Sequence, residues 1–198
     1  MAISTMDHQQ HITTAKDALC ASVPMRQGLV TIFTGDGRGK TTAAIGTALR
    51  AAGHGLRVLV IMFMKGPDFV RGEVVAMETV ANITVRSFGA TGWVEPGCDH
   101  TTHQLEATKA LGFAAESVAA GCYDLMVLDE VISAVTLKVL RLEDVLKFVR
   151  TKPSTLELIL TGRGATNELI GLADLVTEMK NIKHPYEHGV AARAGVDY

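Results

Sequence analysis

Thr34-Gly-Asp-Gly-Arg-Gly-Lys-Thr41 is the stretch of sequence that decides the fold. It follows Leu29-Val-Thr-Ile-Phe33, a β-branched and apolar run that is typical of a buried strand. It precedes an Ala-rich segment, Thr41 to Ala52, which has helical composition and stops at Gly53. A glycine-rich turn between a strand and a helix points its backbone N–H groups inward, and the helix start adds its positive dipole end. The stretch therefore predicts a phosphate-binding loop, or P-loop.

Two residues at the end of this loop supply functional groups. Lys40 brings a mobile positive charge to the phosphates, and Thr41 brings a hydroxyl that suits Mg²⁺. The usual pattern begins with glycine five residues before Gly39, whereas this chain has Thr34 at that position. A glycine-rich turn without a ligand is the alternative, and Gly-Lys-Thr at a strand-to-helix junction argues against it.

A second motif, Leu125-Met-Val-Leu-Asp-Glu130, is an apolar strand that ends in two carboxylates. In P-loop proteins such an acid lies beside the loop and coordinates Mg²⁺, directly or through water. Asp129 and Glu130 are therefore candidate metal ligands. Because buried strands often finish in acidic residues, this motif indicates a metal site only in combination with the P-loop.

Strand-like and helix-like segments alternate along residues 28–198, which we expect to form one domain. This alternation indicates an α/β, P-loop NTPase-like fold, a largely parallel sheet with helices on both faces and ligands at the carboxyl ends of its strands. Residues 1–27 carry few large apolar side chains, so we expect a mobile N-terminal arm. The remaining strands are expected at residues 57–64, 83–88, 124–129, 155–161 and 175–179, and the remaining helices at 73–80, 101–120, 142–150 and 167–173.

Length and composition exclude several classes of protein. A chain of 198 residues with 47% hydrophobic content can bury one sizeable core, and a net charge of -2 argues against a nucleic-acid partner. The longest apolar runs, such as Val58 to Met64, fall far short of the roughly 20 residues of a bilayer span. The N-terminus lacks the features of a secretory signal, and three widely spaced cysteines form neither a disulfide framework nor a zinc pair. We expect a cytoplasmic protein with no membrane partner.

The P-loop and the acidic pair leave many ATP- or GTP-using classes open. Further motifs narrow the choice, and they are Phe33-Thr-Gly-Asp-Gly-Arg-Gly-Lys-Thr-Thr-Ala-Ala44, Gly53-His-Gly55, Phe63-Met-Lys-Gly66, Val127-Leu-Asp-Glu130, Thr161-Gly-Arg163, Ala173-Asp-Leu-Val-Thr-Glu178, Ile182-Lys-His184 and Ala194-Gly-Val-Asp-Tyr198. With these motifs, residues 28–198 resemble the P-loop ATP:corrinoid (cob(I)alamin) adenosyltransferase family, which is related to bacterial cobalamin-synthesis enzymes. The resemblance also accounts for Thr34, because that family has the same substitution, and it implies that ATP lies in the reverse sense along the loop.

The resemblance implies transfer of the 5′-deoxyadenosyl group of ATP to the Co(I) of a reduced corrinoid, with release of triphosphate, in adenosylcobalamin synthesis or salvage. It implies that Lys40, Thr41, Glu130 and Arg163 are the catalytic residues. Thr41 and Glu130, with Asp129 as the second carboxylate, are expected to hold Mg²⁺. The ATP-binding residues implied by the resemblance are Gly35, Asp36, Gly37, Arg38, Gly39, Lys40, Thr41 and Thr42.

The resemblance also concerns the corrinoid and the partners. The family packs an aromatic-rich loop against the corrin, and the corresponding stretch here keeps one aromatic, Trp93; we expect Trp93 and Phe88 to face the corrinoid. A homodimer and a flavodoxin-like reductant are the partners that the resemblance implies.

Two alternative functions remain at this stage. One is a P-loop ATPase or phosphotransferase that releases ADP, and the other is a nucleotide-binding regulatory module without chemistry. His100 and His103 could form a metal pair on one helix face, but solvent-facing residues on a first helical turn are the simpler interpretation. Residues 183–186 are either a surface loop or a segment that closes the site.

Overall fold

The computed structural model describes residues 27–67, 71–92, 94 and 100–197. The expected N-terminal arm, apart from its last residue, and Trp93 lie outside the described residues. The described strands are β1 (Val30–Thr34), β2 (Val58–Met62), β3 (Ile83–Ser87), β4 (Leu125–Asp129), β5 (Glu157–Thr161) and β6 (Leu175–Glu178). They form one six-stranded sheet in the order β3-β2-β4-β5-β1-β6, and every pair of neighbours is parallel. The prediction of a parallel α/β sheet is confirmed.

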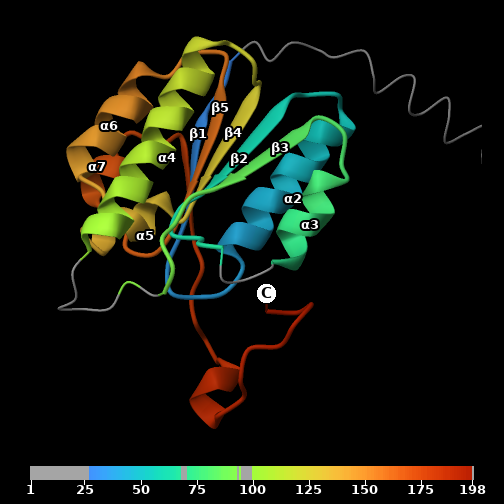
Figure 1. Ribbon diagram of the computed structural model, residues 1–198, viewed down its shortest axis with the longest axis vertical. Coiled ribbons are helices and arrows are strands. Elements are labelled where there is room, and N and C mark those ends of the chain that lie inside the picture. Colours follow the sequence, from blue (N-terminus) through green and yellow to red (C-terminus); the bar gives the residue numbers. More distant parts are fainter. Residues whose placement is uncertain (1–26, 68–70, 93, 95–99, 198) are drawn as a thin grey trace, which may run out of the picture.

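Helices cover both faces of this sheet (Figure 1). On one face lie α2 (Lys40–Gly53) and α3 (Gly72–Glu78), and on the other lie α4 (Thr101–Ala119), α5 (Val131–Thr136), α6 (Leu142–Thr151) and α7 (Asn167–Ile170). Successive side chains of a strand point to opposite faces, which divides the core in two. Val60 packs in the cluster under α2, whereas Leu59 and Ile61 pack in the cluster under α4. No helix in the described parts of the chain is long and apolar enough to cross a membrane.

The strand order brings together, at the carboxyl ends of the strands, the P-loop after β1, the acidic pair at the end of β4 and the loop after β5. β5 lies between β1, which leads into the P-loop, and β4, which ends in the acidic pair. The P-loop also contacts the chain that follows β6, because Gly37 N donates to the Met179 carbonyl at 2.7 Å. A Cβ at Gly37 would lie 2.7 Å from that carbonyl oxygen, so this close approach requires glycine.

Three elements differ from the expectation. α5 was not predicted, since it begins directly after Glu130, which turns the chain with a left-handed backbone (φ 63°, ψ 13°) and without a glycine to mark the turn. α7 ends at Ile170 rather than at residue 173. Beyond β6 the chain leaves the sheet, forms the short 3₁₀ helix η1 (Pro185–His188) and returns toward the P-loop (Figure 1).

Candidate functional site

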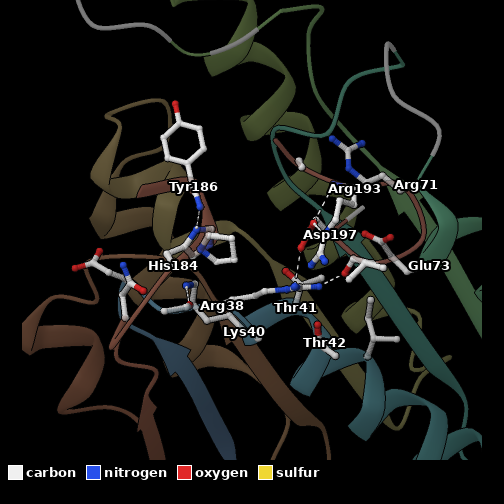
Figure 2. Close-up of a pocket in the computed structure, with 18 of the residues that line it drawn as sticks. Arg38, Lys40, Thr41, Thr42, Arg71, Glu73, His184, Tyr186, Arg193 and Asp197 are labelled. Carbon is white, nitrogen blue, oxygen red and sulfur yellow. Dashed lines mark hydrogen bonds and ion pairs between the residues drawn. The ribbon is translucent and has the colours of Figure 1, made fainter. Parts of the chain in front are cut away.

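A pocket of about 1050 Å³ lies at the carboxyl edge of the sheet, between the P-loop and residues 180–197, which we call the C-terminal segment. Figure 2 shows how the P-loop, the start of α3 and this segment surround it. The acidic residues that line it are Asp36, Glu73, Glu130 and Asp197. Twice as many cationic residues line it: Arg38, Lys40, Lys65, Arg71, Arg163, Lys180, Lys183 and Arg193. The excess of positive charge suits a polyanion such as a triphosphate.

Lys40 lies at the centre of the P-loop. Its ammonium Nζ is buried and donates to the carbonyl oxygens of Gly35 and Gly37, each at 2.7 Å. Burial lowers the pKa of Lys40, and the positive charge of Arg163 lowers it further. Because both causes oppose the charged ammonium, an anion bound between Lys40 and Arg163 would be strongly favoured.

The start of α2 adds a second source of positive potential. Its N-cap, Gly39, has a left-handed backbone (φ 115°), and no side chain of the described residues caps this end of the helix. The first intrahelical bond runs from Ala43 N to the Gly39 carbonyl, so the N–H groups of the first turn precede the helical ladder. A helix end of this kind binds phosphate readily.

Thr34, the departure from the usual P-loop pattern, has a structural task. Its side chain is buried, and its hydroxyl accepts a hydrogen bond from Ala165 N at 3.2 Å. Ala165 belongs to the loop after β5, so the hydroxyl connects the start of the P-loop to the loop that carries Arg163.

Replacing Thr34 with glycine, the residue of the usual pattern, is therefore expected to destabilise this protein. The Ala165 N–H loses its acceptor, which costs about 1–3 kcal/mol in a buried setting. Thr34→Ser keeps the hydroxyl and is the matched control. Chemical denaturation measures the free energy of unfolding, and a Thr34→Gly variant as stable as Thr34→Ser would contradict this role.

The two predicted metal ligands are held differently. Asp129 is only 1% exposed; its Oδ1 accepts from the Thr161 hydroxyl at 2.7 Å, while its buried Oδ2 has no hydrogen-bond partner among the described residues. Burial raises the pKa of Asp129, and the positive charge of Lys65 opposes that rise. Glu130 reaches the pocket, where its Oε1 lies 4.0 Å from the Lys65 ammonium. An unpaired buried carboxylate oxygen beside a second carboxylate fits a hard cation.

Arg163 is brought to the same pocket by the end of β5. Its side chain is exposed, whereas its backbone N–H donates to the Ser133 hydroxyl at 2.9 Å. The structure thus gathers Lys40, Thr41, Glu130 and Arg163, the four predicted catalytic residues, around one pocket, with Asp129 buried behind them.

Comparison with known proteins decides the family. Residues 26–198 match the family model described as ATP:corrinoid adenosyltransferase BtuR/CobO/CobP. The chain belongs to this family.

Several adenosyltransferases of bacteria are similar to this chain over nearly their whole length. The corrinoid adenosyltransferase of Escherichia coli K12 is 34% identical over 190 residues, which cover 96% of this chain and 95% of that protein. The corrinoid adenosyltransferase CobA of Salmonella typhimurium is 36% identical over 191 residues, with the same coverage. The corrinoid adenosyltransferase of Pseudomonas aeruginosa is 31% identical over 182 residues, 92% of this chain and 89% of that protein. The chain is accordingly an ATP:corrinoid adenosyltransferase, an enzyme of adenosylcobalamin synthesis.

Of the two residues expected to face the corrinoid, only Phe88 is described. It follows β3, packs against Phe113 of α4 with ring centroids 5.7 Å apart, and does not line the pocket formed by the described residues. Its carbonyl accepts from Lys65 N at 3.0 Å, so Phe88 fixes the backbone beside a pocket residue. Its contact with the corrinoid stays a prediction. Within the described ranges, no three or more His, Cys, Asp or Glu residues lie close enough together to hold a metal. His100 and His103 therefore belong to no such cluster among these residues.

The pocket of the adenosyltransferase also contains residues to which the sequence analysis assigned no role. Lys65 lines the pocket beside Glu130, and its positive charge also acts on the buried Asp129. The Phe63-Met-Lys-Gly66 motif was the part of the sequence that could have pointed to it. In the C-terminal segment, Asp197 forms an ion pair with Arg38 (2.6 Å), which fastens that segment to the P-loop (Figure 2). A second ion pair, from Asp197 to Arg193 (2.9 Å), lies within the segment. Residues 183–186 line the pocket, which favours the site-closing interpretation over a plain surface loop.

Proposed function

We propose that this pocket binds the triphosphate of ATP and stabilises it as the leaving group when a corrinoid Co(I) attacks the ribose 5′ carbon. The observation that carries the proposal is the convergence of Lys40, Arg163 and the start of α2 on one cationic pocket at the carboxyl edge of a parallel sheet. Ligands of such sheets bind at this edge.

The chemistry requires no protein nucleophile, because Co(I) itself supplies the electron pair. The bond from cobalt to the 5′ carbon forms as the bond from that carbon to the triphosphate oxygen breaks, and the electrons of the broken bond stay on the triphosphate. The enzyme must align the reactants and stabilise the growing negative charge. The backbone N–H groups of residues 35–42, the Lys40 ammonium and the Arg163 guanidinium are the groups proposed to do so.

Thr41, Glu130 and Asp129 are proposed to hold Mg²⁺. The support is the donor set: two carboxylates, one with an unpaired buried oxygen, and a hydroxyl at the start of α2 that lies close enough to favour the charged form of Asp129. Hard oxygen donors of this kind are what Mg²⁺ prefers. When bound, the ion supplies positive charge that neutralises the phosphates.

Glu130→Gln is expected to raise the Mg²⁺ concentration needed for half-maximal turnover, because it removes a charged oxygen ligand and nearly preserves shape. The measurement is a Mg²⁺ titration of corrinoid adenosylation at fixed ATP. Glu143→Gln, a change on α6 at a residue that does not line the pocket, is the matched control. An unchanged Mg²⁺ requirement in Glu130→Gln would assign the metal to Asp129 alone.

The finer proposals rest on the resemblance to the family. Phe88 and Trp93 are proposed to face the corrinoid. A homodimer, a flavodoxin-like reductant that generates Co(I), and a cytoplasmic location, where ATP is abundant, complete the proposal. Light scattering measures the oligomeric state, and adenosylation of a Co(II) corrinoid with and without reduced flavodoxin tests the electron source.

Product analysis tests the reaction against the ATPase or phosphotransferase alternative. Attack at the 5′ carbon yields one triphosphate for each corrinoid alkylated, or pyrophosphate plus phosphate if the triphosphate is cleaved afterwards. An ATPase or phosphotransferase with the same P-loop would release ADP in proportion to turnover. Phosphorus NMR and nucleotide chromatography on one mixture count both. ADP matching the corrinoid converted, or ADP formed without corrinoid, would defeat the proposal.

A further inference from the structure

Two hydroxyl groups connect the acidic pair, Asp129 and Glu130, to the loop after β5 that carries Arg163. One belongs to Thr161, the last residue of β5, and the other to Ser133 in the first turn of α5. Thr161 is fully buried and Ser133 is 8% exposed. Neither residue lines the pocket formed by the described residues, so they act on its contents only through their neighbours.

Thr161 contacts both members of the acidic pair. Its hydroxyl donates to Asp129 Oδ1 at 2.7 Å and accepts from the backbone N–H of Glu130 at 2.9 Å. The first bond fixes one oxygen of the buried carboxylate and leaves Oδ2 as its open side. The second bond holds the backbone of Glu130 at its left-handed turn (φ 63°). Backbone strain of this kind persists only where neighbours enforce it.

Ser133 joins the metal side of the pocket to its phosphate side. Its hydroxyl donates to Glu130 Oε2 at 2.6 Å and accepts from the backbone N–H of Arg163 at 2.9 Å. Thr136, one turn later in α5, donates to the Arg163 carbonyl at 2.9 Å. The backbone N–H and the carbonyl of Arg163 are therefore both tied to α5, the helix that begins directly after Glu130.

The backbone at Gly162 lies very close to the start of α5. Gly162, between Thr161 and Arg163, has φ 142°, and a Cβ there would lie 2.4 Å from Ser133 N and 2.8 Å from its hydroxyl oxygen. The glycine allows β5 to end directly against α5. Without that contact the Ser133 hydroxyl could not reach the Arg163 N–H.

We propose that Ser133 and Thr161 are positioning residues, which hold Asp129, Glu130 and Arg163 in one arrangement that matches Mg·ATP. Each hydroxyl uses its single proton on a carboxylate and accepts from a backbone N–H, so both bonds have a defined direction. This inference deepens the proposed function and rests on the metal role of the two carboxylates. Partners that orient metal ligands typically influence metal affinity by about 10–100-fold.

The test measures ATP binding by calorimetry over a series of Mg²⁺ concentrations, without corrinoid. Ser133→Ala and Thr161→Val are each expected to raise the Mg²⁺ midpoint by about tenfold or more. Thr161→Ser, which restores the hydroxyl, is expected to return close to the wild-type midpoint. Thr31→Val makes the same change at a buried position of β1 away from the pocket and is expected to leave the midpoint unchanged.

A double-variant cycle separates positioning from a merely structural role. In the Glu130→Gln background, Ser133→Ala is expected to raise the Mg²⁺ midpoint by less than about twofold further, because the carboxylate through which Ser133 acts is gone. If Ser133→Ala shifts the Mg²⁺ midpoint as much in that background as in the wild-type protein, the inference is overturned. An unchanged midpoint in folded Ser133→Ala and Thr161→Val would also overturn it. Melting temperatures measured on the same samples identify the folded variants. If Thr161→Val does not fold, the Ser133 cycle decides alone.

The same data distinguish this inference from the proposed function. If Glu130→Gln shifts the Mg²⁺ midpoint and Ser133→Ala does not, the positioning role fails and the metal assignment stands. If wild-type ATP binding does not depend on Mg²⁺, or neither Glu130→Gln nor Asp129→Asn shifts the midpoint, both fail together.

Discussion

Replacing Lys40 with alanine is expected to lower the kcat of corrinoid adenosylation by about 10²–10³, the cost of removing one preorganised donor to a developing negative charge. The Lys40 ammonium lies in the P-loop and lines the pocket. Burial and the charge of Arg163 lower its pKa, and a bound anion would offset both causes and favour the charged ammonium. Initial-rate measurements at saturating ATP and corrinoid give the comparison.

The control for this variant is Lys109→Ala. Lys109 pairs with Glu106 on the exposed side of α4 and does not line the pocket, so its replacement is expected to leave kcat unchanged. Circular dichroism establishes that the Lys40→Ala protein is folded. A near-normal kcat in a folded Lys40→Ala variant would contradict the proposal that Lys40 stabilises the leaving triphosphate.

Asp129→Asn is expected to lower activity by about tenfold or more and, at the same time, to raise the melting temperature of the ligand-free protein. Activity is expected to fall because the proposed metal site loses a charged ligand. Stability rises because the wild-type carboxylate is buried with Oδ2 unpaired, and burial raises its pKa. Removing a charge from such a position is expected to gain about 0.5–2 kcal/mol.

The sign of the pH dependence follows from the raised pKa of Asp129. At low pH the carboxyl group is protonated in the folded and the unfolded protein, so the buried charge costs nothing. Above the raised pKa the folded protein bears that charge, and its stability is lower. The stability gain of Asp129→Asn is therefore expected at neutral pH and should shrink as the pH falls. Thermal scans in a pH series measure it, and a variant less stable than wild type at neutral pH would contradict the account.

Local patterns were enough to predict most of this fold from sequence. The alternation of apolar strands and helices predicted the parallel sheet, and its strands begin and end within one or two residues of the expected positions. The P-loop was predictable because strand, glycine-rich turn and helix are consecutive in sequence. The acidic pair at the end of β4 was predictable for the same reason, since both motifs are read without knowing any long-range contact.

The remaining parts depend on contacts between distant segments. The turn at Glu130 is held by Thr161, which lies 31 residues further along, so no local signal marked the start of α5. The task of Thr34 became clear only from its bond to Ala165, and that of Asp197 only from its pairing with Arg38. Short motifs containing these residues carried the family resemblance, but a motif does not state which atoms meet.

The most direct test of the central claim is a single spectrophotometric reaction. The protein is mixed with ATP, Mg²⁺ and cobalamin that has been chemically reduced to Co(I), and the corrin spectrum is followed over time. We predict conversion to the spectrum of an alkyl-cobalt corrinoid, with one triphosphate equivalent for each cobalt alkylated, and a far slower conversion with Lys40→Ala. A folded, ATP-binding protein that leaves the Co(I) spectrum unconverted would contradict the account.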